Sequence, residues 1–221
     1  MRWGRLGAFW ALPWAPYALS FALQALLAPW LVHDWDGFVF VRAAEQIVRG
    51  VTPYAIAEQA PNYIFLNGEW PSPNSWFAYP PGALALFAPF VGVASLLTHD
   101  PFVLRFALKL PLIVGNLLLA FVVGKAVARM GGNERRAVLL TLFNPFLILI
   151  AAVWGMFDAW IMVFLVLCAL LLADRRPVAA GVAFAAAVGT RLQVGADDGA
   201  DQAAQDRDPR GDRRGTAHVS V

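Results

Sequence analysis

Two aspartates two residues apart are the first candidates for chemistry in this sequence. Asp34 and Asp36 stand in the stretch His33-Asp34-Trp35-Asp36, directly after a long apolar run. Such carboxylates could act as a general base or hold a divalent cation, because both roles need a negatively charged oxygen. Paired acids are also common in solvated loops, so spacing alone leaves that interpretation open. The neighbouring tryptophan and apolar run indicate a membrane interface, which favours a functional role.

Cations inside an apolar run are the second candidates. Arg105 and Lys109 lie one helical turn apart within the run 102–128, and Asn116 lies two turns further along roughly the same face. A charge within a membrane is costly unless an anion or a water-filled cavity accompanies it. An anion such as a lipid phosphate would satisfy both cations, although Arg105 could also extend to the lipid headgroups.

Two further charged residues stand at the ends of apolar runs. Asp158 closes the short turn 154–158 and could simply cap the helix that follows, since a helix N-terminus attracts negative charge. Arg191 ends the last apolar run and could extend to the headgroups. In the topology derived below, six candidates share one side of the membrane: Asp34, Asp36, Arg105, Lys109, Asp158 and Arg191.

The composition is typical of an integral membrane protein. Hydrophobic residues make up 59% of the 221 residues and charged residues 14%, against about 45–50% and about 25% in soluble domains. A soluble core of this size could not bury so much apolar surface, whereas lipid could. The net charge of +2 gives no indication of nucleic-acid binding. The one cysteine, Cys168, cannot form an intrachain disulfide.

The apolar runs predict an all-α, multi-pass helical bundle in the cell (cytoplasmic) membrane. The expected spans are 7–32, 102–128, 137–153, 159–173 and 178–192. Arg2 and Arg5 place the N-terminus in the cytoplasm, because basic residues stay on that side. The same rule applies to six later basic residues: Lys125, Arg129, Arg135, Arg136, Arg175 and Arg176.

This topology leaves residues 33–101 as a large extracytoplasmic first loop. Within it, residues 37–50 are predicted to form an amphipathic helix along the membrane surface. The segment 80–97 is apolar but contains Pro89. Because the topology puts both of its ends outside, we predict a re-entrant or half-buried hairpin. The alternative is a true span, which would move the basic cluster at 129–136 to the outside.

The C-terminal segment 194–221 departs from the membrane pattern. It contains no Leu, Ile, Phe, Met, Trp or Tyr, and ten of its 28 residues are charged, so we predict disorder. An acidic extracellular tail is one explanation. We favour a shift of reading frame, because other frames of GC-rich DNA tend to encode Ala, Gly, Arg, Asp and Pro. Residues 1–193 would then form one transmembrane module.

Four stretches resemble a known family in their order and spacing. They are 34–54 (DWDGFVFVRAAEQIVRGVTPY), 77–90 (FAYPPGALALFAPF), 105–129 and 143–193. Together they resemble glycosyltransferases of the GT-C fold that use polyprenyl-phosphate sugars, closest to the GPI mannosyltransferase I-like enzymes and their prokaryotic relatives. The resemblance implies the N-terminal part of a GT-C fold. It also implies inverting transfer of a sugar such as mannose from polyprenyl phosphate to a hydroxyl of a lipid or glycan acceptor outside the cytoplasm.

The resemblance also implies roles for individual residues. A first-loop aspartate acts as the base in such enzymes, and this role would fall on Asp34 or Asp36. The leaving phosphate needs positive charge, for which Arg105, Lys109 and Arg191 are the candidates. Two other residues would contact sugar or acceptor, namely Asp158 and Tyr79. No cofactor is firmly expected, and a divalent cation on the two aspartates stays an open alternative.

Other functions remain open from the sequence. Members of the resembled family usually continue for several helices beyond the position of Arg191, so a C-terminally truncated, inactive chain is one expectation. A lipid or small-anion transporter would also explain Lys109, and a non-catalytic membrane subunit is the third possibility. The sequence contains no P-loop, GxGxxG, HExxH or Cys/His metal spacing, which argues against nucleotide-driven transport and zinc chemistry.

Overall fold

All regular structure in the described part of the chain is helical. The computed structural model describes residues 12–31, 33–53 and 79–191, without the side chains of Asp34, Trp35 and Arg191. Its helices are α2 (Ala15–Leu27), α3 (Asp34–Val48), α4 (Pro81–Leu97), α5 (Pro101–Arg129), α6 (Glu134–Leu142), α7 (Pro145–Ile148), the π-helix η1 (Leu149–Trp154), α8 (Asp158–Ala173) and α9 (Pro177–Arg191). The predicted tail and the first residues of the first predicted span lie outside these ranges.

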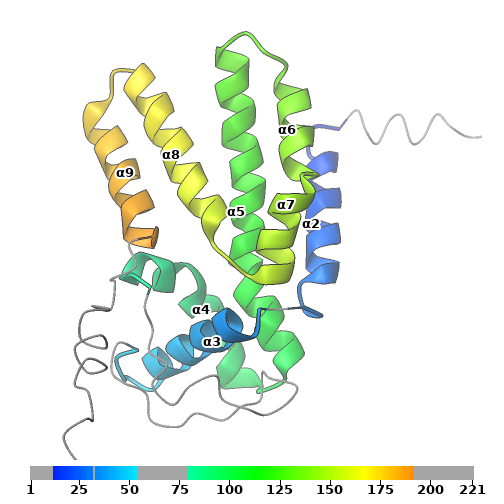
Figure 1. Cartoon of the computed structure of the whole chain (residues 1–221), viewed down its shortest axis with the longest axis vertical. Coiled ribbons are helices and arrows are strands. Elements are labelled where there is room, and N and C mark those ends of the chain that lie inside the picture. The colour runs from blue at the N-terminus through cyan, green and yellow to red at the C-terminus, as the bar shows by residue number, and fades with distance from the viewer. Residues whose placement is uncertain (1–11, 32, 54–78, 192–221) are drawn as a thin grey trace, which may run out of the picture.

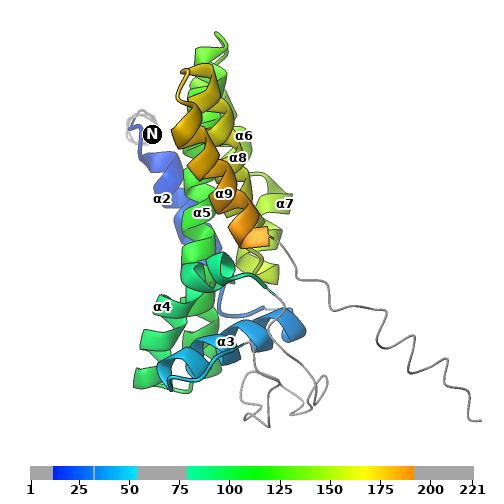
Figure 2. The same cartoon turned by 90° about the vertical axis from the view of Figure 1, so that its left-hand side faces the viewer.

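The helices form an upright bundle with a smaller layer at one end. Helix α5 runs along the centre, with α2 and α6 on one side and α8 and α9 on the other (Figure 1). Helices α3 and α4 lie at the lower end, and the second view confirms that α3 runs across the bundle (Figure 2). The turns after α5 and α8 lie together at the upper end, where Arg129 pairs with Asp174 at 3.0 Å. The basic turns therefore lie opposite α3 and α4.

Within the described ranges, one helix is long and apolar enough to cross a membrane by itself. This helix is α5, which matches the predicted span 102–128 closely. The pair α6 and α7–η1 would supply a second span if its two bent parts are counted together. Four other helices are apolar but shorter: α2, α4, α8 and α9. The all-α class is confirmed, while the number of crossings stays a prediction.

The predicted span 137–153 is wrong as one straight helix. The chain bends by 46° between α6 and the segment α7–η1. Pro145 has no backbone N–H for an α-helical hydrogen bond, and the Asn144 side chain instead accepts from the N–H of Phe146 at 2.9 Å. The π-helix ends at Trp154, and the next residue, Gly155, has a φ of +97°, which suits glycine and strains other residues. Apolar composition alone does not reveal this break.

A buried polar network compensates for the break. Ser20 donates to the carbonyl of Leu142 at 2.9 Å, and Gln24 donates to Ser20 at 3.0 Å. Asn116 donates both to Gln24 at 2.8 Å and to the carbonyl of Leu147 at 2.9 Å. Buried carbonyls need such donors, because a buried polar group without a hydrogen bond is costly. The network therefore joins α2 and α5 to both sides of the bend.

Helices α3 and α4 differ from the sequence-based expectation. Helix α3 begins at Asp34 instead of residue 37, so both aspartates lie in its first turn. Its predicted polar face is covered, since Arg42 is 8% and Glu45 is 7% exposed. Helix α4 continues through Pro89 as one helix and has no hairpin turn. Phe38 on α3 and Phe87 on α4 lie in the same apolar core as residues of α5, so much of α3 packs against the other helices, while its position along the membrane surface stays a prediction.

Candidate active site

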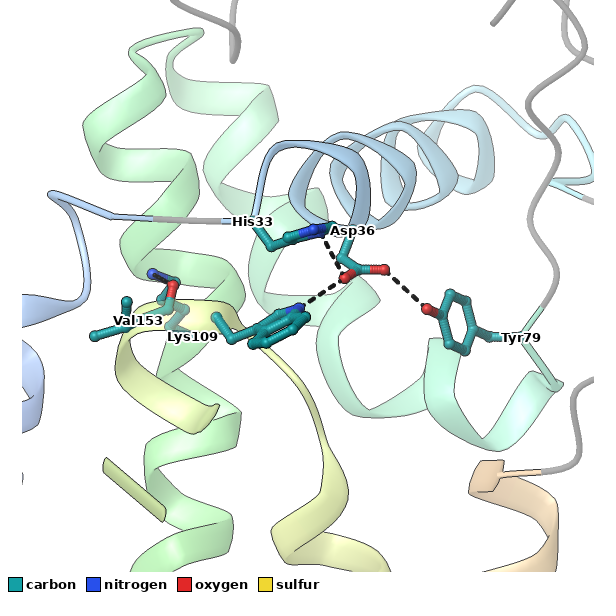
Figure 3. A network of polar contacts seen from close by, with 6 residues as sticks. His33, Asp36, Tyr79, Lys109 and Val153 are labelled. Atoms are coloured by element: carbon teal, nitrogen blue, oxygen red, sulfur yellow. Dashed lines mark hydrogen bonds and ion pairs between the residues drawn. The ribbon is translucent and has the colours of Figure 1, made fainter. Parts of the chain in front are cut away.

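Asp36 is the centre of the candidate site. Tyr79 donates its hydroxyl to Asp36 Oδ1 at 2.9 Å, and the indole Nε1 of Trp154 donates to Oδ2 at 3.0 Å. The Nδ1 atom of His33 lies 2.9 Å from the same Oδ2 (Figure 3). The Asp36 side chain is only 10% exposed, so these partners replace most of the water around the carboxylate. We refer to Asp36, His33, Tyr79 and Trp154 as the Asp36 cluster.

Three separate parts of the chain bring this cluster together. His33 precedes α3, Trp154 ends η1, and Tyr79 precedes α4. The backbone N–H of His33 donates to the carbonyl of Trp154 at 3.3 Å, and their rings stack with centroids 5.1 Å apart. The Tyr79 ring packs against Phe40 and Phe157, at centroid distances of 4.9 and 5.4 Å. The backbone hydrogen bond and the ring contacts thus fix the directions in which His33, Trp154 and Tyr79 face Asp36.

Lys109 lies beside the cluster and is fully buried. Its Nζ donates to the carbonyls of Ala28 at 2.9 Å, Ala152 at 2.8 Å and Val153 at 3.0 Å, and also to that of Leu31. The carbonyls of Ala28, Ala152 and Val153 stand at the ends of α2 and η1, where the helix dipole favours a cation, and that of Leu31 lies in the segment after α2. Lys109, which the sequence predicted to bind a phosphate, is therefore surrounded by carbonyl oxygens. Its hydrogen bonds to them join two helix ends to α5.

The other predicted site residues lie outside the Asp36 cluster, on α5, α8, α9 and the first turn of α3. Arg105 is on α5, one turn before Lys109, and is 8% exposed. Asp158 is the first residue of α8 and follows Phe157, a neighbour of Tyr79. For Asp34, whose side chain is not described, the structure gives only its place in the first turn of α3.

Arg191 ends α9 close to the beginning of α4. A Cβ atom on Gly82 would overlap the carbonyl of Gly189 and lie 3.2 Å from the backbone nitrogen of Thr190. The two backbones can approach this closely only because Gly82 has no side chain. Tyr79 stands three residues before Gly82, so the backbone of Arg191 is brought toward the part of the chain that carries the cluster. The Arg191 side chain itself is not described.

Comparison with known proteins identifies the family. The sequence model of the alpha-(1->6)-mannopyranosyltransferase N-terminal domain matches residues 5–196. The chain belongs to this family. The comparisons with curated proteins and with solved structures give no match. The family match confirms the resemblance to mannosyltransferases and the prediction of a glycosyltransferase enzyme.

The structure also shows contacts of Asp36 that the sequence could not reveal. His33 and Trp154 were not among the predicted site residues, although both contact Asp36. His33 stands three residues before Asp36, a spacing that brings side chains together once the helix is known to begin at Asp34. Trp154 is 118 residues away from Asp36, and no local pattern reports such a contact. Among the described residues, no three His, Cys, Asp or Glu side chains are grouped to hold a metal ion.

Proposed function

We propose that this chain contributes the active-site end of a membrane mannosyltransferase that uses a polyprenyl-phosphate mannose donor. The family description supports mannose as the sugar and a 6-hydroxyl as the accepting group. This hydroxyl would belong to a lipid or glycan. Transfer with inversion to an α product requires a donor whose phosphate is β-linked, because the anomeric carbon reverses its configuration. The sugar would move on the extracytoplasmic side of the cell membrane.

The Asp36 cluster is the observation that supports this proposal most directly. A buried carboxylate with three donors is costly to assemble, and active sites commonly contain such groups. The cluster lies at the end of the bundle that carries α3 and α4, opposite the turns with Arg129, Arg175 and Arg176. Those turns face the cytoplasm if basic residues follow the positive-inside rule, which would leave Asp36 at the outer surface.

Positive charge for the leaving phosphate would come from Arg191 or Arg105. Stabilising the developing phosphate anion lowers the barrier for breaking the bond between the anomeric carbon and oxygen. The close approach of Gly82 and Gly189 supports Arg191, because it brings the end of α9 next to the segment that begins with Tyr79. Lys109 is better explained as a positioning residue, since carbonyl oxygens already accept its hydrogen bonds.

The test is mannosyl transfer by the full chain in membrane vesicles. Asp36→Asn should lower the rate about 100-fold or more, because it removes the negative charge on which the cluster depends. Asp34→Asn is assayed beside it, since Asp34 is the second acid that the sequence offers as base. Adding a chelator to the wild type tests whether the two acids need a divalent cation.

Asp174→Asn is the matched control for these variants. Asp174 pairs with Arg129 at the opposite end of the bundle and is partly exposed, so its loss should leave the rate within about twofold. An Asp36→Asn variant that inserts normally and transfers mannose at the wild-type rate would contradict the assignment of the site. A wild-type chain that transfers no mannose from polyprenyl-phosphate mannose would contradict the proposed function itself.

A further inference from the structure

The Asp36 carboxylate has little capacity left to accept another proton donor. Its Oδ2 atom lies within hydrogen-bond distance of both Trp154 Nε1 and His33 Nδ1, and its Oδ1 atom accepts from Tyr79. A carboxylate oxygen offers about two lone pairs, so Oδ2 is saturated and Oδ1 is half used. With a 10% exposed side chain, Asp36 is also poorly accessible to an acceptor hydroxyl.

The His33 imidazole, unlike the Asp36 carboxylate, is accessible and has a free capacity to accept a proton. Its side chain is 48% exposed, although one ring nitrogen lies against a buried carboxylate. An ionised carboxylate only accepts hydrogen bonds, so Nδ1 of His33 must carry the proton in this contact. The neutral imidazole then has its lone pair on Nε2, on the opposite edge of the ring. Stacking on Trp154, with 22° between the ring planes, fixes the direction of that edge.

Helix capping does not explain this arrangement. His33 is the N-cap residue of α3, yet its side chain makes no capping hydrogen bond to the helix. The backbone N–H of an N-cap residue often donates to an acidic side chain in the first turn, but that of His33 donates to the backbone carbonyl of Trp154. Asp36 accepts from the imidazole and not from the backbone. The side chains of His33 and Asp36 are therefore directed toward each other, away from the roles that would stabilise the helix end.

We propose that His33 is the general base of the transfer reaction and that Asp36 orients it. This inference rests on the proposed function. The acceptor hydroxyl gives its proton to Nε2 of His33, and its oxygen forms the new bond to the anomeric carbon of mannose. The bond from that carbon to the phosphate oxygen breaks, and its electron pair leaves with the polyprenyl phosphate. Asp36 stabilises the imidazolium that results, as a buried carboxylate does for a histidine base.

His33→Asn separates orientation from catalysis. The asparagine amide can still donate to Asp36 from about the position of Nδ1, so the fold is retained, but no lone pair replaces that of Nε2. We expect kcat to fall about 100-fold or more, the usual contribution of a general base, with the KM for the donor within about twofold. His33→Ala should lose the same activity. A His33→Asn variant with kcat within threefold of the wild type overturns the inference and leaves the proposed function standing.

His99→Ala is the matched histidine control. His99 also lies near a carboxylate, but its Nδ1 is 3.9 Å from Glu45, beyond hydrogen-bond distance. We expect its kcat to stay within about twofold of the wild type. A loss as large as that of His33→Asn would mean that the assay reports general damage to the layer of α3 and α4, and would overturn the inference.

The tautomer of His33 provides a measurement independent of activity. Nitrogen NMR of the ¹⁵N-histidine-labelled full chain in detergent, with His33 assigned by the signal lost in His33→Ala, should show the Nδ1–H form of the neutral ring. Asp36→Ala should abolish that preference. A neutral His33 with its proton on Nε2 overturns the inference, because no lone pair would face the acceptor. If the tautomer is as expected but the wild type transfers no mannose, the proposed function fails and the inference fails with it.

Discussion

Replacing Lys109 by methionine tests whether its buried ammonium holds the bundle together. Methionine keeps the length and apolar stem of the side chain but leaves the carbonyls of Ala28, Ala152 and Val153 without that donor. Three hydrogen bonds to a charged group contribute about 4–5 kcal/mol at about 1.5 kcal/mol each. Removing a buried charge returns part of this, so we expect a net loss of about 3 kcal/mol.

Thermal unfolding in detergent, followed by tryptophan fluorescence at one scan rate, measures this loss. For a chain of this size, about 3 kcal/mol corresponds to a fall in Tm of about 6–12 °C. Lys125→Met is the control, because Lys125 is on the same helix but its side chain is 49% exposed and pairs with Glu134 at 2.7 Å. An exposed pair contributes at most about 1 kcal/mol, or about 4 °C. Equal shifts in the two variants would refute the reasoning.

Two further changes probe the layer that carries the site. Gly82→Ala should lower the Tm by several degrees, because its Cβ overlaps the Gly189 carbonyl and overpacking costs about 1–3 kcal/mol. Gly181→Ala on α9 meets no atom within 4 Å and should raise the Tm slightly, and the opposite order would be inconsistent with the packing. Burial raises the pKa of Glu45 above its ordinary 4.5, outweighing the opposing effects of Arg49, His99 and Arg42. The contribution of Glu45 to stability is therefore complete below its ordinary pKa and declines as pH rises through its raised pKa in the folded protein. The plot of Tm against pH should be flatter for Glu45→Gln, and an unchanged slope would contradict this.

The apolar helices were predictable because a lipid environment would impose a strict pattern on the sequence. A segment that crosses a membrane must be apolar and must satisfy its backbone hydrogen bonds internally, so an uninterrupted run predicts a helix. The run 102–128 became α5, and the runs 159–173 and 178–192 became α8 and α9. The bend between α6 and α7 was missed because Pro145 lies within an apolar run, where hydropathy alone does not register a missing N–H.

The site was predictable only in part, for a different reason. Asp36 was among the candidates because an acid at the end of an apolar run is conspicuous in the sequence. Its partner Trp154 was not among the candidates, since nothing local reports a contact made by folding. Lys109 was expected to bind phosphate because the sequence shows the buried cation but not the carbonyls at two helix ends that accept from it.

The position of Lys109 links the stability of the bundle to the geometry of the site. Its ammonium donates to the carbonyl of Leu31, two residues before His33, and to the carbonyl of Val153, directly before Trp154. Those two side chains are the donors to Oδ2 of Asp36. The contacts that fix the helix ends therefore also set the distance between the donors. Lys109→Met should consequently reduce both Tm and mannosyl transfer, whereas His33→Asn should reduce transfer with little change in Tm, because it leaves every contact of Lys109 in place.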